Sequence, residues 1–311
     1  MIKLSIVICT YNRAALVGGT INCLLSQAAD KPSVEIIVVD NNSRDGTKEA
    51  VEGFVSRSRN MRYVFEGEQG LSYAKNRGFR EAKGEYVGYI DDDILLPDCW
   101  IDIALKTMDA HNPDAFGGPI FACYLKKPPA WFDSTRNDIS WGEKERYFEK
   151  GERFYGCNVV FKKSLLQDIG GFRADAGVSG RYFSSNENED VLIFDDIWRK
   201  YPGAKVYYSP SMYVRHLLFE NIADPILNMR FLFSRGLNSA NRKLNGGAPG
   251  RGAIFLRELE AIFANAAAAL LQLHRQSSLD AWLWRWGGGV AYHAGRLLGA
   301  IGVKIRMKRR N

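Results

Sequence analysis

The stretch Glu85-Tyr-Val-Gly-Tyr-Ile-Asp-Asp-Asp93 joins a short apolar run to three consecutive carboxylates. The apolar part is typical of a buried strand. Three adjacent negative charges at its end repel one another unless a cation neutralises them, and hard divalent cations prefer carboxylate oxygens. Ligands of open α/β sheets bind just outside the carboxyl ends of the strands. The stretch therefore predicts a strand that ends at a ligand-binding site.

The segments before this strand alternate between strand and helix patterns. Short β-branched apolar runs are typical of parallel strands buried on both faces, and apolar residues recur at helical spacing between them. The expected elements are strands at 4–9, 34–39 and 62–65 and helices at 17–28, 47–57 and 72–82, with a further helix after Pro97. This order predicts an α/β fold with an open, mostly parallel, twisted sheet flanked by helices.

The alternating pattern is lost over residues 111–150, where we expect loops and edge strands that help to shape a pocket. Order returns at 154–161, and a helix is expected to begin at Glu189-Asp190. Two further strands are expected at 205–209 and 212–215.

Charge and composition divide the chain near residue 223. Residues 1–223 contain 28 Lys/Arg and 31 Asp/Glu, and residues 224–311 contain 14 and 4, so the net charges are −3 and +10. We therefore expect a main domain over 1–223 and a basic, helical, amphipathic extension over 224–311. The five cysteines are scattered without CxxC spacing, which favours a reduced, cytoplasmic protein and disfavours a cysteine-bound metal.

The basic extension has no run of about 18 apolar residues, so a membrane-spanning helix is not expected. An amphipathic helix on an anionic membrane surface fits its composition better, with the protein peripheral on the inner face of the cell membrane. Nucleic acid is a less suitable partner, because Trp and Leu interleave with the charges. Core packing or a homodimer contact is the alternative role for Trp282, Trp284 and Trp286.

Polar residues follow three of the expected strands: Thr10-Tyr-Asn-Arg13, Asp40-Asn-Asn-Ser43 and Asp91-Asp-Asp93. The ends of parallel strands meet at one edge of a sheet, so these groups should converge on one ligand. GxGxxG does not follow the first strand, and GxxxxGK[ST] does not occur. Dinucleotide-binding and P-loop proteins therefore lose their main support.

The chain resembles the family 2 glycosyltransferases with the GT-A fold, in which a nucleotide-binding half is joined to an acceptor half. The matching segments, in the family's order, are Ser5–Arg13, Glu35–Thr47, Gly70–Gly78, Gly84–Asp93, Gly156–Phe161, Gly170–Phe172, Glu189-Asp190 and His216. The resemblance covers residues 1 to about 220 and leaves the extension uncovered.

The resemblance implies roles for individual residues. Thr10, Tyr11 and Asp40 would contact the base and ribose of a nucleotide sugar, and Lys75 or Arg77 would reach its diphosphate. Asp91 would face the ribose, and Asp93, with Asp91 and His216, would bind Mg²⁺ or Mn²⁺. The remaining expected substrate contacts are Asn12, Arg13, Asn42, Asn76, Asp92 and Asn158.

Asp190 matches the family's catalytic base, which takes the acceptor hydroxyl proton during direct, inverting attack. Glu189 is the alternative base. Trp131, in the aromatic-rich stretch 119–150, is a candidate to stack on a sugar ring.

We therefore expect an inverting, metal-dependent glycosyltransferase. It would move a sugar from a nucleotide-sugar donor, most often a UDP-sugar in this family, to a hydroxyl of a glycan or lipid-linked acceptor. Two alternatives stay open: a nucleotidyltransferase, and a non-catalytic nucleotide-sugar-binding or membrane scaffold protein.

Overall fold

The computed structural model describes residues 1–174, 182–183, 189–218, 223–226, 228–230, 232–233, 236, 239, 251–271, 278–300 and 307–308. The chain divides into two compact units. The first comprises Met1–Cys123, Asn137–Gly180 and Asn188–Leu217, and the second comprises Tyr124–Arg136, Arg181–Glu187 and Leu218–Asn311.

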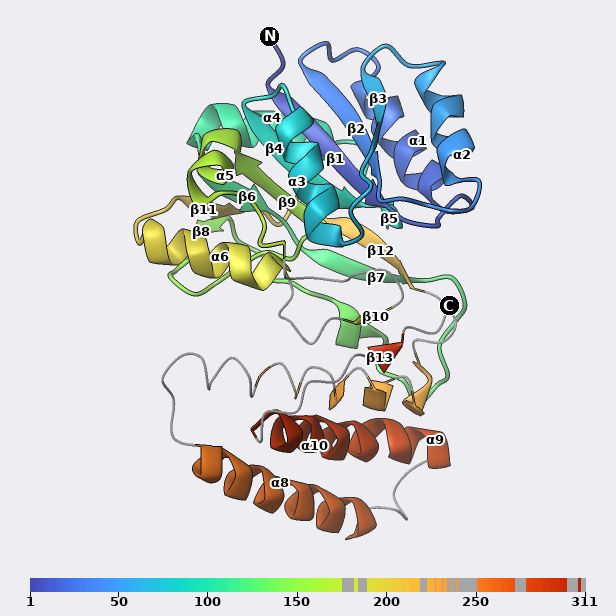
Figure 1. Cartoon of the computed structure of the whole chain (residues 1–311), viewed down its shortest axis with the longest axis vertical. Helices are drawn as coiled ribbons and strands as arrows, with labels where there is room; N and C mark the ends of the chain where they lie inside the picture. The colour runs from blue at the N-terminus through green and yellow to red at the C-terminus, as the bar shows by residue number, and fades with distance from the viewer. Residues whose placement is uncertain are drawn as a thin grey trace. The chain divides into compact units, whose positions relative to one another are not determined.

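The main sheet of the first unit contains eight strands among the described residues (Figure 1). Their order is β3 (Met61–Phe65), β2 (Val34–Asp40), β1 (Leu4–Thr10), β4 (Tyr86–Asp91), β9 (Asn158–Lys162), β6 (Ala115–Gly117), β11 (Val206–Tyr208) and β8 (Arg146–Tyr147). β9 and β8 run antiparallel to their neighbours, whereas the other pairs are parallel. The sheet is therefore mostly parallel, as the sequence predicts.

Helices cover both faces of this sheet, because alternate strand residues point to opposite sides. One apolar core joins even-numbered residues of β1 to α1 (Val17–Ala28), α2 (Thr47–Val55) and α4 (Trp100–His111). The other joins odd-numbered residues of β1 to α3 (Leu71–Glu81), α5 (Lys163–Ile169) and α6 (Glu189–Lys200). The strands carry apolar residues on both faces, which explains their continuous hydrophobic runs.

The strands and helices expected before residue 111 are present within a few residues of their expected ends. The expectation that residues 111–150 hold only loops and edge strands is wrong for β6, which lies between β9 and β11. Its three residues are too few to show a pattern. Gly117 also fits only without a side chain, because a Cβ atom there would lie 2.4 Å from the carbonyl oxygen of Asn158.

A smaller sheet orders β5 (Ile94–Leu95), β12 (Val214–Leu218) and β7 (Ile120–Tyr124). β5 and β12 are antiparallel, with His216 opposite Ile94. The backbone N–H of Leu217 donates to the carbonyl of Asp93 at 2.9 Å. This pairing brings His216, from late in the chain, beside the three aspartates.

The second unit contains α8 (Arg251–Leu271), α9 (Leu279–Trp282), a π-helical turn (Leu283–Gly287) and α10 (Gly288–Ala300). Buried Glu258 of α8 binds His293 at 2.7 Å and Arg296 at 2.9 Å, both on α10. Trp284 packs against Phe132 at 5.0 Å between ring centroids. The segment 124–136 thus groups with the C-terminal region, which the sequence analysis did not anticipate.

In the described part of the second unit, no helix is both long and apolar enough to cross a bilayer. The short strands β10 (Tyr182–Phe183) and β13 (Met307–Lys308) pair antiparallel within this unit. Most of 226–243 and of 301–311, where we expected a helix and the basic end of the extension, lies outside the described residues.

Candidate active site

The polar groups that follow β1, β2 and β4 lie at one edge of the main sheet, as predicted. Thr10 at the end of β1 is in register with Asp40 at the end of β2, and Cys9 is in register with Asp91 at the end of β4. The backbone N–H of Asn41 donates to the carbonyl of Thr10 at 2.9 Å, which holds the two strand ends together.

The three consecutive aspartates point to different partners. Buried Asp92 accepts a hydrogen bond of 2.6 Å from the Thr10 hydroxyl. Asp93 lies 3.1 Å from Nε2 of His216, and 3.7 Å from the guanidinium of Arg13. One ligand atom each from Asp91, Asp93 and His216 lie within 4.8 Å of one another. The last three residues could therefore share one cation, and Asp92 is held out of that group by Thr10.

Burial dominates the electrostatics of this cluster. It raises the pKa of Asp91 to about 6 and that of Asp92 to about 7, and the neighbouring carboxylates add to both shifts. Burial also raises the pKa of Asp93, but the hydrogen bond and charge of His216 outweigh it, so the net pKa is lowered. The pKa of His216 is raised correspondingly, because Asp93 outweighs the effect of burial. The cluster is short of positive charge, which a divalent cation would supply.

The loops after β1 and β2 are tied to each other rather than free. Asn12, with φ of +52°, accepts from the N–H of Arg44 at 2.8 Å. Asn42, with φ of +63°, donates to the carbonyl of Gly67 at 3.2 Å. Asn and Gly tolerate this left-handed conformation best. Tyr11 and Arg13 are half-buried in the loop after β1. Arg13 lies beside Asp93.

Asp40 is buried, and both of its oxygens have partners. Oδ2 accepts from the Tyr63 hydroxyl at 2.8 Å, and Oδ1 accepts from the N–H of Ser43 at 2.9 Å. The carboxylate therefore fixes the end of β2.

The polar residues of α3 are divided between the interior and the surface. Lys75 is 2% exposed and donates to Glu189 at 2.8 Å. Asn76 is buried and binds the backbone of Phe172 through both its amide nitrogen and its oxygen. Arg77 is partly exposed and pairs with Glu81 at 3.0 Å. Lys75 and Asn76 thus face the first turn of α6 and the Gly170–Phe172 segment.

Asp190 is buried beside this ion pair, in the first turn of α6. Its Oδ2 accepts from the N–H of Gly156 at 3.3 Å. Among the described residues, no hydrogen-bond partner reaches its buried Oδ1. Burial and the charge of Glu189 raise the pKa of Asp190, and Lys75 partly offsets that shift. A carboxylate with a free oxygen and a raised pKa has the properties of a general base.

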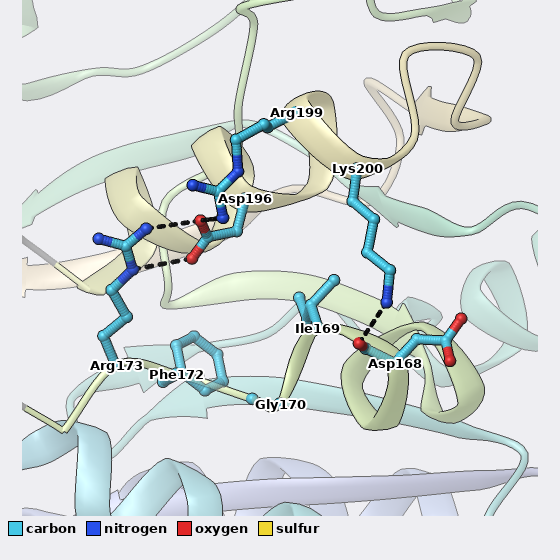
Figure 2. A pocket seen from close by; sticks show the side chains of 9 residues that line it. Asp168, Ile169, Gly170, Phe172, Arg173, Asp196, Arg199 and Lys200 are labelled. Atoms are coloured by element: carbon cyan, nitrogen blue, oxygen red, sulfur yellow. Dashed lines mark hydrogen bonds and ion pairs between the residues drawn. The ribbon is translucent and has the colours of Figure 1, made fainter. Parts of the chain in front are cut away.

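One salt bridge and one hydrogen bond to a backbone carbonyl tie α6 to its neighbours further along its length. Asp196 accepts from Arg173 at 2.6 Å and from Arg199 at 2.7 Å (Figure 2). Lys200 donates to the carbonyl of Asp168 at 2.6 Å, at the end of α5. These residues line a surface pocket of about 320 Å³, in which Asp196 binds both arginines shown in Figure 2. The Arg173–Asp196 pair in this pocket therefore holds α6 against the segment that contains Phe172.

Asn158 does not face an open site. It is completely buried, and its Oδ1 accepts from Trp100 Nε1 at 3.0 Å. Its amide nitrogen donates to the carbonyls of Pro119 and Met212 at 3.2 and 2.8 Å. In this structure the expected substrate contact is instead a tie between α4, β9 and the segments that lead to β7 and β12.

We expect Asn158→Ala to lower the free energy of unfolding by about 3 kcal/mol, because it leaves an indole N–H and two carbonyls buried without partners. Urea unfolding measures the change. Asn22→Ala, on the exposed side of α1, is the matched control and should change stability by less than about 0.5 kcal/mol. A loss at Asn158 no greater than the control's would contradict the role assigned to the buried amide.

Trp131 lies in the second unit, where its ring is 6.2 Å from that of Trp284 and 6.0 Å from that of Phe132. Sequence reasoning missed the Lys75–Glu189 pair, the Thr10–Asp92 hydrogen bond and the Arg173–Asp196 pair. The sequence feature most closely related to the Lys75–Glu189 pair is Gly156, where a Cβ atom would lie 2.3 Å from the Lys75 nitrogen.

Comparison with known proteins agrees with the fold. The sequence profile described as "Glycosyl transferase family 2" matches residues 5–170, more than half of the chain. A mixed α/β chain with this sheet and this Asp-Asp-His cluster is of the GT-A glycosyltransferase class. The chain belongs to glycosyl transferase family 2, as the sequence motifs predict, and is an enzyme of that family.

Curated relatives include the glucosyl-dolichyl phosphate glucuronosyltransferase of Haloferax volcanii, which is 28% identical over 228 residues, 70% of each chain. The GalNAc(5)-diNAcBac-PP-undecaprenol beta-1,3-glucosyltransferase of Campylobacter jejuni is 30% identical over 177 residues. That match spans 54% of this chain and about half, 54%, of the relative.

Solved structures show the same fold. The mannosyltransferase PcManGT from Pyrobaculum calidifontis, in complex with GDP-Man and Mn²⁺, has a TM-score of 0.60 at 20% identity and covers 96% of this chain and 86% of its own. TarS from S. aureus, in complex with UDP, has a TM-score of 0.53 at 19% identity and covers 76% and 65%. At these identities the likeness supports the fold alone, and it confirms the predicted GT-A architecture.

Proposed function

We propose that the protein is an inverting, metal-dependent glycosyltransferase that uses a nucleotide-sugar donor. The observation that carries the proposal is the Asp91–Asp93–His216 cluster at the carboxyl ends of the strands in a family 2 chain. Support also comes from the described relatives, since PcManGT was solved with GDP-Man and Mn²⁺ and TarS with UDP.

The residues of the cluster fit a divalent cation. They offer two carboxylates and one imidazole, and Asp93 and His216 are 3.1 Å apart, close to the roughly 3 Å between neighbouring ligands of an octahedral Mg²⁺ site. Asp91, Asp93 and His216 would hold Mg²⁺ or Mn²⁺. When bound there, the ion would stabilise the negative charge of a nucleoside diphosphate leaving group.

The strand-end loops would bind the nucleotide. Thr10, Tyr11 and Asp40 lie where β1 and β2 end. Asn12 links the loops that carry them, and Asn42 ties the second loop to Gly67 after β3. A rigid loop loses little conformational freedom on binding, which favours affinity. Arg13, already close to Asp93, is placed to balance the charge of the phosphates.

Asp190 would act as the base. It would accept the proton of the acceptor hydroxyl at Oδ1, which has no partner among the described residues, as the hydroxyl oxygen attacks the anomeric carbon. The new bond forms on the face opposite the nucleoside diphosphate, and the anomeric configuration inverts. One displacement needs one base, and the buried, partly unbonded Asp190 supplies it.

The acceptor is proposed to be a glycan or lipid-linked saccharide. The names of the Haloferax and Campylobacter relatives specify dolichyl phosphate and undecaprenol-PP acceptors. A lipid-linked acceptor would bring the enzyme to the cytoplasmic membrane face, where the basic residues 224–311 would meet anionic lipids.

We expect a cognate nucleotide sugar to raise the unfolding temperature only when Mn²⁺ is present, because ligand bound to the native state stabilises it by mass action. A thermal-shift screen of UDP-glucose, UDP-N-acetylglucosamine and GDP-mannose, each with Mn²⁺ or with EDTA, measures this. At a ligand concentration of 100 times Kd the stabilisation is about 2.7 kcal/mol. Equal stabilisation in EDTA would contradict the metal requirement.

A further inference from the structure

A buried ion pair joins α3 to the first turn of α6. Lys75 Nζ donates to Glu189 Oε1 at 2.8 Å, and the two side chains are 2% and 8% exposed. An unpaired charge in such a place costs several kcal/mol, so each partner depends strongly on the other. The lysine is enclosed, and its charge also acts on Asp91, whose pKa it lowers against the larger effect of burial.

The walls around the ion pair fix its position. The Lys75 nitrogen lies 5.2 Å from the centre of the Phe172 ring and 5.9 Å from that of Tyr89. On another side, a Cβ atom at Gly156 would lie 2.3 Å from the lysine nitrogen. Aromatic faces attract the cation, and the bare glycine backbone leaves it room.

The Lys75–Glu189 ion pair makes the surroundings of the neighbouring carboxylates Glu189 and Asp190 different. Glu189 is occupied by the lysine, whereas Asp190 binds only the N–H of Gly156 through Oδ2 and keeps Oδ1 without a partner among the described residues. The lysine charge also partly offsets the effect of the Glu189 charge on Asp190.

We propose that Lys75 and Glu189 are positioning residues, whose ion pair fixes the first turn of α6 and thereby the orientation of the Asp190 carboxylate that takes the acceptor proton. This inference rests on the proposed function, in which Asp190 is the base. It gives Lys75 a role on the acceptor side of the site, beside its expected role at the donor diphosphate.

The charged and titratable groups around Asp190 come from three elements. α3 contributes Lys75, α6 contributes Glu189, and the segment before β9 contributes Cys157 and the N–H of Gly156. The negative Glu189 raises the pKa of Asp190 and the positive Lys75 lowers it. Removing the Glu189 charge should therefore lower the pKa of Asp190, and removing the Lys75 charge should raise it.

Two single variants test the proposal through the pH profile. Protonation of Asp190 lowers the rate at acidic pH, but Asp91 and Asp92, with pKa values raised to about 6 and about 7, contribute to the same limb of kcat/KM. The titration of the Asp190 carboxyl itself therefore decides, and the limb is compared with it. We expect Glu189→Gln, whose amide still accepts from Lys75, to move the limb to lower pH by about one unit, and Lys75→Met to move it to higher pH by about one unit. Lys75→Arg keeps the charge and should leave the limb near the wild-type position.

The profile is measured as release of nucleoside diphosphate from UDP-glucose, UDP-N-acetylglucosamine and GDP-mannose with Mn²⁺. Carbon NMR of the ¹³C-labelled Asp190 carboxyl follows the same titration without turnover. Asp195→Asn, at an exposed position of α6, is the matched control and should not move it. If Lys75→Met does not fold, the Glu189→Gln titration decides alone.

The positioning role would be overturned if Glu189→Gln left the pKa of Asp190 unchanged. It would also be overturned if Glu189→Gln and Lys75→Met moved that pKa in the same direction. An Asp190→Asn enzyme that retains turnover would instead overturn the proposed base and leave the ion pair as packing. The two failures are therefore distinguishable in one set of variants.

Discussion

Asp190→Asn should lower turnover about a thousandfold while leaving donor binding intact. A general base typically contributes 10²- to 10⁴-fold, and an amide cannot take the hydroxyl proton. The amide oxygen can still accept from the N–H of Gly156, so the first turn of α6 should keep its structure. Steady-state rates of nucleoside diphosphate release, with calorimetric titration of the donor, measure the two effects.

The control for this variant is Asp195→Asn, the same change at an exposed position of the same helix. It should keep turnover within about twofold, as expected for a surface site away from the reaction. Because burial raises the pKa of Asp190, its negative charge destabilises the fold at neutral and higher pH. Asp190→Asn should therefore unfold at the wild-type temperature or above, so a lower unfolding temperature would assign Asp190 to stability instead.

Asp93→Asn should weaken Mn²⁺ binding at least about a hundredfold, since loss of residues that merely support a ligand already costs 10- to 100-fold. Asp93 is also the partner that raises the pKa of His216. We therefore expect this substitution to lower the His216 pKa as well, which proton NMR of the imidazole detects without substrate.

Asp98→Asn, an exposed aspartate five residues later in the chain, is the matched control for the metal titration. It should bind Mn²⁺ as the wild type does. Wild-type Mn²⁺ affinity in Asp93→Asn would mean that the cation binds elsewhere, and the Asp91–Asp93–His216 site would be wrong.

The sheet was predictable where each strand is buried on both faces. β1, β2 and β4 carry nearly uninterrupted apolar residues, and helical spacing between them marks α1 and α3. β6 was not predictable, because three residues show no periodicity and its central place depends on pairing with β9 and β11. The grouping of 124–136 with the C-terminal unit likewise depends on packing between distant segments.

The strand-end residues of the site were predictable for a topological reason, since parallel strands bring their carboxyl ends to one edge. The surroundings of each residue were not. Lys75 and Glu189 are 114 positions apart, and they meet only because α3 and α6 pack on the same face of the sheet. The residues around Asn158 in the sequence do not indicate that its side chain is hydrogen-bonded to three other segments of the chain.

The central claim is that this family 2 chain transfers a sugar from a nucleotide sugar. The most direct test is to identify the small product released from a panel of nucleotide sugars, and from nucleoside triphosphates with sugar 1-phosphates, in the presence of Mn²⁺. Phosphorus NMR distinguishes the products. The account predicts a nucleoside diphosphate, released from a nucleotide sugar and lost in Asp190→Asn. Release of pyrophosphate from a nucleoside triphosphate would contradict it and would favour a nucleotidyltransferase.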